Sequence, residues 1–203
     1  MTVELIHGPS EADWLEVKRR ALVTVGKKPL DKPRTDWRRA ILRARHSPIR
    51  YLVYSFYIHD IPTWVSTHLV RHHVGIQPYV RSQRNDRQDM YDRNAARQDT
   101  PVDMIVDINA EALQTLANKR LCNLAALETR CVVEEMCKLA VAHTPELDGL
   151  LVPDCQRHGG RCYEMHPCTK REEEDDDYLT PGVDALTEAA LLQMERRGNN
   201  GAD

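Results

Sequence analysis

The segment from Gly75 to Thr100 carries few apolar residues and many Arg, Asp, Asn and Gln side chains. It separates the best strand candidate, on its N-terminal side, from two strong helical patterns on its C-terminal side. A long polar segment inside a compact domain is usually functional or mobile. Hydrophobic residues make up 41% of the 203-residue chain, which suffices for a core and argues against wholesale disorder. The length suits one domain, or one domain with a tail.

Charge and hydropathy exclude several classes of protein. The formal net charge is −3, so any attraction to phosphates must come from a local patch. No apolar run approaches the roughly 20 residues that span a bilayer. The N-terminus lacks the basic region and apolar core of a signal peptide. We therefore expect no membrane partner and a cytoplasmic location, in a bacterium or a phage-infected cell, where cysteines are thiols or metal ligands before they are disulfides.

Two helices are expected before residue 45. Ser10 with Asp13 three residues later is a helix start related to the capping box, and Gly26 suits the end of that helix. A second helix is predicted from Asp36 to about Ala44. We expect Ser47-Pro48 to end it, because the residue before a proline avoids the α region.

The best strand candidate runs from Arg50 to His59, which is rich in Tyr, Val, Ile and Phe. Asp60-Ile61-Pro62 is predicted to turn the chain. Thr63 is then expected to cap a short helix that carries His68 and His72.

Two longer helices are predicted from Met104 to Cys122 and from Leu124 to about His143, on the spacing of their apolar residues. These patterns alone favour a mostly helical protein with one strand. We expect a main domain over residues 1–170 and, over 171–203, a tail with three parts. These are an acidic linker (172–177), a short helix (181–195) and a disordered end (198–203).

The strongest functional cluster lies between Arg71 and Arg84, where basic residues and one hydroxyl straddle Gly75 and Pro78. Arginine forks match phosphate oxygens, a hydroxyl adds a neutral donor, and Gly75 lets the backbone approach a ligand closely. The cluster predicts a phosphate or nucleotide site. On charge alone, a solvated basic loop at a helix C-terminus explains it equally well. Its members are Arg71, His72, His73, Arg81, Ser82 and Arg84.

A second polar pair lies on the predicted helix from Met104 to Cys122. Asn109 and Arg120 are eleven residues apart, about three helical turns, so they share a face with apolar residues between them. Such a pair can be buried or can line a ligand site. An ion pair of Arg120 with Glu111 or Glu128 is the commoner alternative.

The run HLVRHHVGIQPYVRSQR (68–84) resembles the signature of the flavin-dependent thymidylate synthases, which reads Arg-His-Arg, a short gap, then Ser-x-Arg. The resemblance extends over roughly residues 10–170. Its other elements are Ser47-Pro48 before the strand, Asn109 and Arg120, and the Ala-x-x-Glu-x-Arg step at Ala125–Arg130. The order and spacing of four separate elements carry the resemblance more than any single motif.

The chain departs from the family pattern at several places. His73 stands where the signature has its second arginine, and Ser82-Gln83-Arg84 lies one residue further along than usual. A histidine carries only partial charge near neutrality, whereas an arginine is fully charged. The other departures are Tyr79 and Val80 in place of an acidic residue, Thr115 in place of Asn, and Arg50 in place of Glu.

The resemblance implies an α/β (α+β) fold, with an antiparallel sheet flanked by helices and long C-terminal helices. It also implies the conversion of dUMP to dTMP. Methylenetetrahydrofolate supplies the carbon, reduced FAD supplies the hydride, and NADPH recharges the flavin. A homotetramer with sites between subunits is expected.

The family's functional residues carry over to matching positions in this sequence. Arg120 would be the catalytic cation that holds the uracil ring and stabilises developing negative charge. The expected FAD contacts are Ser47, Arg71, His72, His73 and Asn109. The expected dUMP contacts are His68, Arg71, Ser82, Arg84, Arg93 and Arg120.

Three alternatives remain open. The altered signature is compatible with a related flavin-dependent enzyme that modifies another pyrimidine nucleotide. A non-catalytic nucleotide- or nucleic-acid-binding protein is also compatible, although the acidic net charge and the lack of interleaved aromatic residues argue against nucleic acid. A structural zinc site is the minor alternative to free thiols in the loop that holds Cys155, His158, Cys162, His166 and Cys168.

Overall fold

The computed structural model describes residues 1–28, 31–87 and 92–168. Residues 1–163 form one compact unit, and Glu164 begins a second, of which the structure describes residues 164–168. The acidic run, the helix and the tail expected beyond residue 170 lie outside the described residues. The predicted domain boundary at residue 170 therefore stays a prediction. None of the described helices is both long and apolar enough to cross a membrane.

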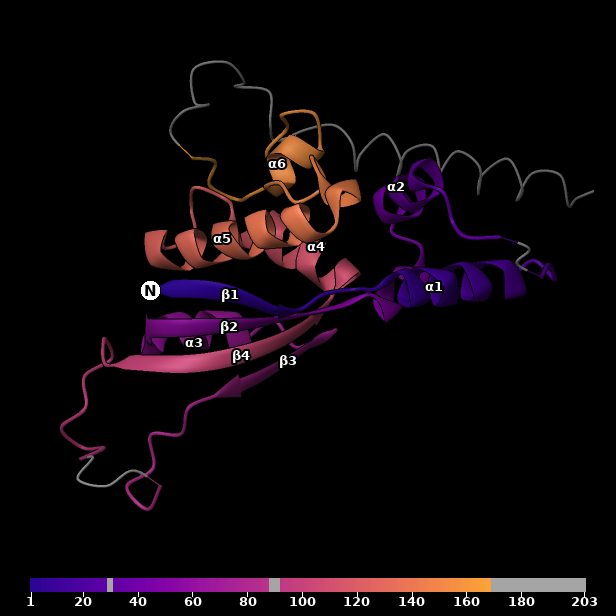
Figure 1. The fold of residues 1–203 in the computed structure, drawn as a ribbon. Helices are drawn as coiled ribbons and strands as arrows, with labels where there is room; N and C mark the ends of the chain where they lie inside the picture. The colour runs from indigo at the N-terminus through magenta and orange to yellow at the C-terminus, as the bar shows by residue number, and fades with distance from the viewer. Residues whose placement is uncertain (29–30, 88–91, 169–203) are drawn as a thin grey trace, which may run out of the picture. The chain divides into compact units, whose positions relative to one another are not determined.

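A four-stranded antiparallel sheet organises the first unit (Figure 1). Its strands lie in the order β1 (Thr2–His7), β2 (Val53–Pro62), β4 (Pro101–Asn109) and β3 (Ile76–Val80). All three pairings are antiparallel, which confirms the expected sheet. Pro78 is tolerated in β3 because an edge strand has backbone donors that need no partner.

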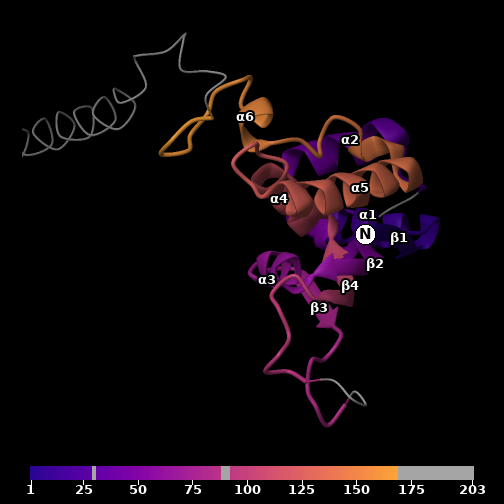
Figure 2. The same ribbon diagram turned by 90° about the vertical axis from the view of Figure 1, so that its left-hand side faces the viewer.

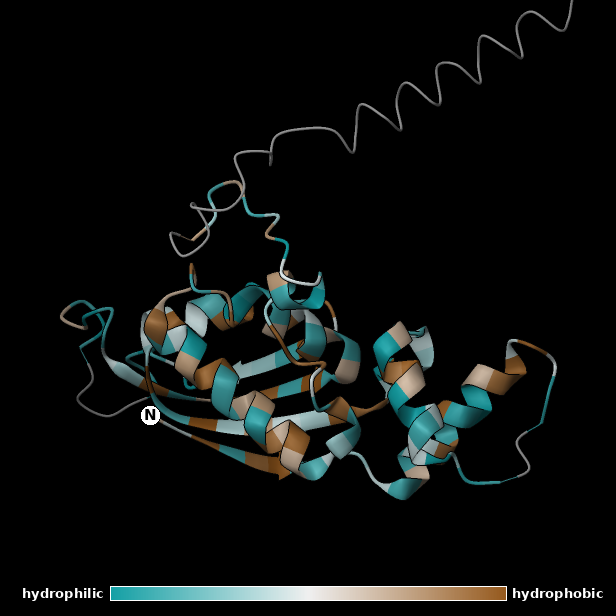
Figure 3. Cartoon of the chain, turned by 90° about the horizontal axis from the view of Figure 1, so that it is seen from above, coloured by the Kyte–Doolittle hydropathy of each residue, from teal (hydrophilic) through white to brown (hydrophobic). Residues whose placement is uncertain are grey.

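Helices cover one face of this sheet. In Figure 1, α4 (Ala110–Arg120) and α5 (Leu127–His143) lie above the strands, and α5 contacts both β1 and β2. Brown and teal bands alternate along the strands beneath the helices in Figure 3, as expected for a sheet buried on one face. Each large apolar side chain buried there contributes roughly 1.5–3 kcal/mol. The largest fully buried side chains of the two central strands are Tyr54, Phe56, Ile58, Ile61, Met104 and Ile108.

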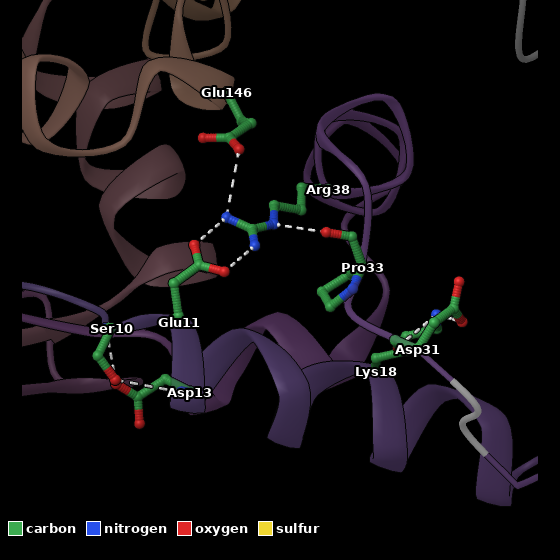
Figure 4. A network of polar contacts seen from close by, with 8 residues as sticks. All are labelled: Ser10, Glu11, Asp13, Lys18, Asp31, Pro33, Arg38 and Glu146. Atoms are coloured by element: carbon green, nitrogen blue, oxygen red, sulfur yellow. Dashed lines mark hydrogen bonds and ion pairs between the residues drawn. The ribbon is translucent and has the colours of Figure 1, made fainter.

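The N-terminal helices form a separate layer at one end of the sheet. Ser10 caps α1 (Glu11–Val23) through the predicted capping box with Asp13, which confirms that helix start. Arg38, on α2 (Thr35–Ala44), connects the elements of this layer through its guanidinium, as Figure 4 shows. Its guanidinium donates to both carboxylate oxygens of Glu11, at 2.7 and 2.6 Å, and lies 3.6 Å from the buried carboxylate of Glu146. Glu146 belongs to η2 (Pro145–Leu147), so one side chain joins three elements.

The helix predicted from Met104 to Cys122 is wrong in its first part. Residues 101–109 are strand β4, and only Ala110–Arg120 is helical. Val102, Met104, Val106 and Ile108 are buried while the residues between them are partly exposed, which is the two-residue period of a strand. Asn109 therefore lies at the N-cap of α4, not within a long helix.

The boundaries around β2 also differ from the prediction. Residues 47–51 form a short 3-10 helix, η1, that begins at Ser47, so Ser47-Pro48 opens an element and does not end α2. The helix α2 ends because Arg45 adopts the left-handed conformation (φ 52°). The strand starts at Val53, not Arg50, and continues through the predicted turn at 60–62. Its register with β4 shifts between Ile58 and Ile61, where Asp60 has a positive φ.

The short helix α3 (Thr63–Val70) follows β2 directly. Thr63 does not cap it, because its hydroxyl donates across to the carbonyl of Thr100 at 2.8 Å. His72 lies beyond the helix end. The predicted helix from Leu124 begins three residues later, at Leu127. Strands β1 and β3 and the four-residue helix α6 (Asp154–Arg157) were not predicted.

Candidate functional site

A pocket of about 500 Å³ opens where α3 ends and α4 begins. The segment from Arg71 to Ile76 forms one wall, and the first turns of α4 form the other. Arg50 of η1 completes the lining. The pocket therefore brings together four of the residues predicted to contact FAD, Arg71, His72, His73 and Asn109. The α4 residues that line the pocket are Glu111, Ala112 and Thr115.

Gly75 lets the two walls touch. It has a φ of +75°, and a Cβ placed there would lie 2.3 Å from Nδ2 of Asn109 and 3.0 Å from the Cβ of Ala112. The Gly75 carbonyl accepts a hydrogen bond from the Asn109 backbone N–H at 3.0 Å. The Asn109 side chain accepts from the Ala112 N–H at 2.9 Å, so it caps α4. Any other residue at position 75 would push the 71–76 wall away from α4.

Arg120 reaches the same segment from the other end of α4. Its Nε donates to Nε2 of His72 at 2.9 Å, and its Nη2 donates to the His68 carbonyl at 3.1 Å. His68 in turn contacts the Thr129 hydroxyl at 3.0 Å through Nδ1. Burial lowers the pKa of His72, and the nearby charge of Arg120 and then His73 lowers it further. Burial also lowers the pKa of Arg120, with Arg71 adding to the effect.

The site is cationic, with one acidic exception. Within the described residues, no carboxylate forms an ion pair with Arg71 or Arg120. Glu111 is paired instead with Arg50, through both oxygens of its carboxylate. The predicted alternative, an ion pair of Arg120 with Glu111 or Glu128, is therefore wrong, because the partners of Arg120 among the described residues are His72 and His68. Arg50 was expected only as a departure from the family pattern, and its pairing with Glu111 was not predicted.

Three of the six predicted nucleotide residues lie elsewhere, whereas Arg71 lines the first pocket and His68 and Arg120 adjoin it. Ser82, Arg84 and Arg93 belong to the segment between β3 and β4, which projects away from the sheet in Figures 1 and 2. Arg84 there pairs with Asp86 at 2.7 Å. Arg84 and Arg93 line a separate, open pocket of about 480 Å³ together with Asn85, Asp86 and Asn94.

The register of β3 separates these two groups. Ile76, beside the first pocket, pairs with Ile108, whereas Val80, next to the projecting segment, pairs with Met104. At about 3.4 Å per residue, the two ends of β3 are about 14 Å apart. One chain therefore does not bring Ser82, Arg84 and Arg93 to the pocket that holds Arg71 and Asn109.

The remaining predicted residues have mixed positions. Ser47 is exposed and begins the turn that carries Arg50, but does not itself line the pocket.

In the described part of the chain, no group of three or more His, Cys, Asp or Glu side chains is placed to hold a metal ion. Cys155 and His158 lie at α6, and His158 stacks edge-on against Tyr163. The zinc alternative for that loop rests on composition alone.

Comparison with known proteins gives a consistent picture of the fold. No protein-family model matches the sequence, and no curated protein matches it. Thymidylate synthase X from Helicobacter pylori, solved with FAD and dUMP, aligns with a TM-score of 0.59 at 15% identity, over 74% of this chain and 99% of that one. A second Helicobacter pylori structure with FAD and dUMP gives 0.61 at 16%, over 75% and 100%.

A third similar structure is the UMP/dUMP methylase PolB from Streptomyces cacaoi, bound with 5-Br dUMP. It aligns with a TM-score of 0.58 at 17% identity, over 73% of this chain and 93% of that one. At these identities the likeness concerns the fold. In this chain the sheet of β1, β2, β4 and β3, covered by α4 and α5, carries the pocket described above. The chain has the fold of the flavin-dependent thymidylate synthases.

Proposed function

We propose that this protein is a flavin-dependent thymidylate synthase that converts dUMP to dTMP, with methylenetetrahydrofolate as the carbon donor and FAD recharged by NADPH. One observation carries the proposal. The signature residues Arg71, His72 and His73 meet Asn109 around one pocket, on a fold that similar structures use together with FAD and dUMP. The resemblance of the sequence to the same family, from the Ser47-Pro48 step to the Ala125–Arg130 step, adds support.

The residues of the pocket fit a ligand with a pyrophosphate. Arg71 supplies a forked donor that no described carboxylate neutralises, and the segment around Gly75 runs close to the opposite wall. His72, His73 and Asn109 add donors of neutral or partial charge. FAD, when bound, would supply the hydride chemistry. The protein's own residues would bind and orient it, with Ser47 as a further proposed contact at the start of η1.

Arg120 has a proposed role towards the pyrimidine. Its described hydrogen bonds use Nε and Nη2, which leaves Nη1 available for a ligand oxygen. A cation held in a fixed orientation stabilises charge that develops on the uracil ring without having to reorganise. His68, whose carbonyl helps to orient Arg120, would border the same nucleotide.

The separation of the two pockets supports assembly from several copies of the chain. Ser82, Arg84 and Arg93 are proposed to bind the dUMP phosphate or sugar, but in one chain they lie at the far end of β3. A second copy could bring its projecting segment to the Arg71 pocket. We therefore include a homotetramer with shared sites in the proposal. Mixing an Arg120→Met variant with an Arg84→Met variant should restore activity that neither has alone.

The decisive experiment is the spectrum of the purified protein, followed by an assay. We expect FAD to bind and give a visible absorption band that bleaches on addition of NADPH. The loaded protein should then form dTMP from dUMP and methylenetetrahydrofolate. Protein that stays colourless with added FAD would overturn the proposal and favour a non-catalytic nucleotide-binding role.

One alternative has a specific observation in its favour. His73, Thr115 and the Arg50–Glu111 pair alter the pocket relative to the family pattern, and PolB, with a similar fold, is a UMP/dUMP methylase. The protein could therefore act on a different pyrimidine nucleotide. Flavin-loaded protein that bleaches with NADPH but methylates UMP and not dUMP would establish this alternative.

A further inference from the structure

The hydrogen bond between Arg120 and His72 determines where His72 carries its proton. A guanidinium has donors only, so its Nε–H at 2.9 Å requires Nε2 of His72 to be the acceptor. A neutral histidine has one protonated nitrogen, which must then be Nδ1. No described residue accepts a hydrogen bond from that Nδ1, and His72 lines the pocket.

The surroundings favour the neutral ring. Arg120 from α4 stands directly against His72, and Arg71 and His73 lie on the same segment. His68 of α3 accepts a hydrogen bond from Arg120 through its carbonyl. Among the described residues that line the pocket, the one carboxylate, that of Glu111, is engaged by Arg50. A proton added to Nε2 would both remove the acceptor of Arg120 and place two cations in contact.

We propose that Arg120 is a positioning residue that locks His72 in the Nδ1–H tautomer, so that His72 donates this proton to an oxygen atom of the bound ligand. The oxygen is that of a phosphate or a carbonyl, the acceptors that FAD and dUMP both carry. The identity of the ligand rests on the proposed function, whereas the tautomer does not. Arg120 thereby acts on the pocket in two ways, through its own Nη1 and through the ring it holds.

The tautomer can be read directly in the ligand-free protein. Histidine labelled with ¹⁵N distinguishes a protonated from an unprotonated ring nitrogen, and the His72→Gln spectrum assigns the signals. We expect a protonated Nδ1 and an unprotonated Nε2 for His72 at neutral pH, and a mixture of tautomers in Arg120→Met. A protonated Nε2 in the unaltered protein, or an unchanged tautomer in Arg120→Met, would overturn the lock.

A matched pair of variants tests the donor. In His72→Asn, the amide nitrogen occupies the position of Nδ1 and keeps the donor, but the acceptor for Arg120 is lost. In His72→Gln, the amide oxygen reaches the position of Nε2 and keeps Arg120 in place, but the donor is lost. FAD binding followed by flavin fluorescence should fall roughly tenfold in the Gln variant and less than about threefold in the Asn variant.

The outcomes separate this inference from the proposed function. Equal losses in both variants, with unchanged melting temperatures, would show that His72 only packs and would overturn the donor role. If the unaltered protein binds neither FAD nor dUMP, the proposed function fails, and inorganic pyrophosphate becomes the probe. A shift of the His72 Nδ1 resonance on adding pyrophosphate then supports the donor, and the absence of any shift overturns it.

Discussion

Arg38 and Arg120 each hold three parts of the chain together, but the groups that accept their hydrogen bonds differ. Arg38 is bound by the carboxylates of Glu11 and Glu146, and the hydrogen bond with Glu11 raises its pKa. Arg120 is bound by a neutral ring and a carbonyl, and burial lowers its pKa. A cation neutralised by carboxylates stabilises the fold. A cation held by neutral acceptors is not neutralised, so its positive electrostatic potential can attract an anionic ligand.

The largest expected effect is on catalysis. Arg120→Met removes the fixed cation, and we expect kcat for dTMP formation to fall roughly 10²–10³-fold, as for the loss of one preorganised donor. The melting temperature should change little, because no carboxylate loses its partner. Lys138→Met, which removes an exposed cation from the neighbouring helix α5, is the matched control. A large loss of stability with unchanged kcat in Arg120→Met would erase the contrast between the two arginines.

The next effect is on stability. Arg38→Met leaves the carboxylate of Glu146, which is only 8% exposed, without its cation, and we expect a loss of about 1–3 kcal/mol in the free energy of unfolding. Urea denaturation measures it. Arg34→Met breaks a pair whose arginine is 82% exposed, so it should cost less than about 0.5 kcal/mol. Similar losses of unfolding free energy in both variants would mean that the ion pairs of Arg38 contribute no more than an ordinary surface pair.

The region around Arg120 and the region around Arg38 should also lose stability in different pH ranges. The pKa of His68 and of His72 lies below its ordinary value of 6.5 in the folded chain, mainly because of burial. The two neutral histidines contribute fully to the free energy of unfolding above pH 6.5. This contribution declines as the pH falls through their lowered pKa, because the histidines of the unfolded chain take up protons at a higher pH than those of the folded chain. Glu11, whose pKa its hydrogen bond with Arg38 lowers from 4.5, contributes only to the loss below that pH.

Unfolding curves measured across the acid range separate these windows. We expect His72→Gln to reduce the loss of unfolding free energy that begins below pH 6.5. The loss that begins below pH 4.5 should stay unchanged. Glu11→Gln should do the reverse. A single transition that both substitutions shift equally would show that the two regions titrate as one unit.

The smallest expected effect concerns His73. If this residue touches the FAD phosphates, FAD retention should weaken a few-fold between about pH 6 and about pH 8, because a histidine loses its charge over that range. His73→Arg should restore retention at the higher pH, since an arginine keeps its charge. Equilibrium dialysis at several pH values measures it. FAD affinity that is constant across the range, in both proteins, would remove His73 from the contact.

Part of the site was predictable because family spacing holds where backbone geometry is constrained. Arg71, His72 and Asn109 were expected at a cofactor site, and they line one pocket. Gly75 was expected to allow a close approach, and its backbone does approach the opposite wall closely. The predicted substrate residues Ser82 and Arg84 do not lie with them, because they follow β3 and the strand carries them to its other end.

The fold shows a similar division. The antiparallel sheet was expected only from the family resemblance, since periodicity suggested a mostly helical chain. Residues 104–109 were assigned to a helix because Ile105 and Ile108 continue the spacing of the real helix that follows. A short strand read without its partner resembles part of a buried helix, and only pairing with β2 on one side and β3 on the other distinguishes the two.

The amino-acid sequence settled those features whose partners lie within a few residues of each other. Ser10 and Asp13 form their capping box across one helical turn, and the apolar spacing of α5 is complete within the helix itself. The tertiary structure decided the rest, because Arg120 meets His72 across 48 residues of chain and Arg50 meets Glu111 across 61. Such contacts depend on how β2, β3 and β4 align, so no local pattern could specify that one arginine binds a carboxylate and the other a histidine ring.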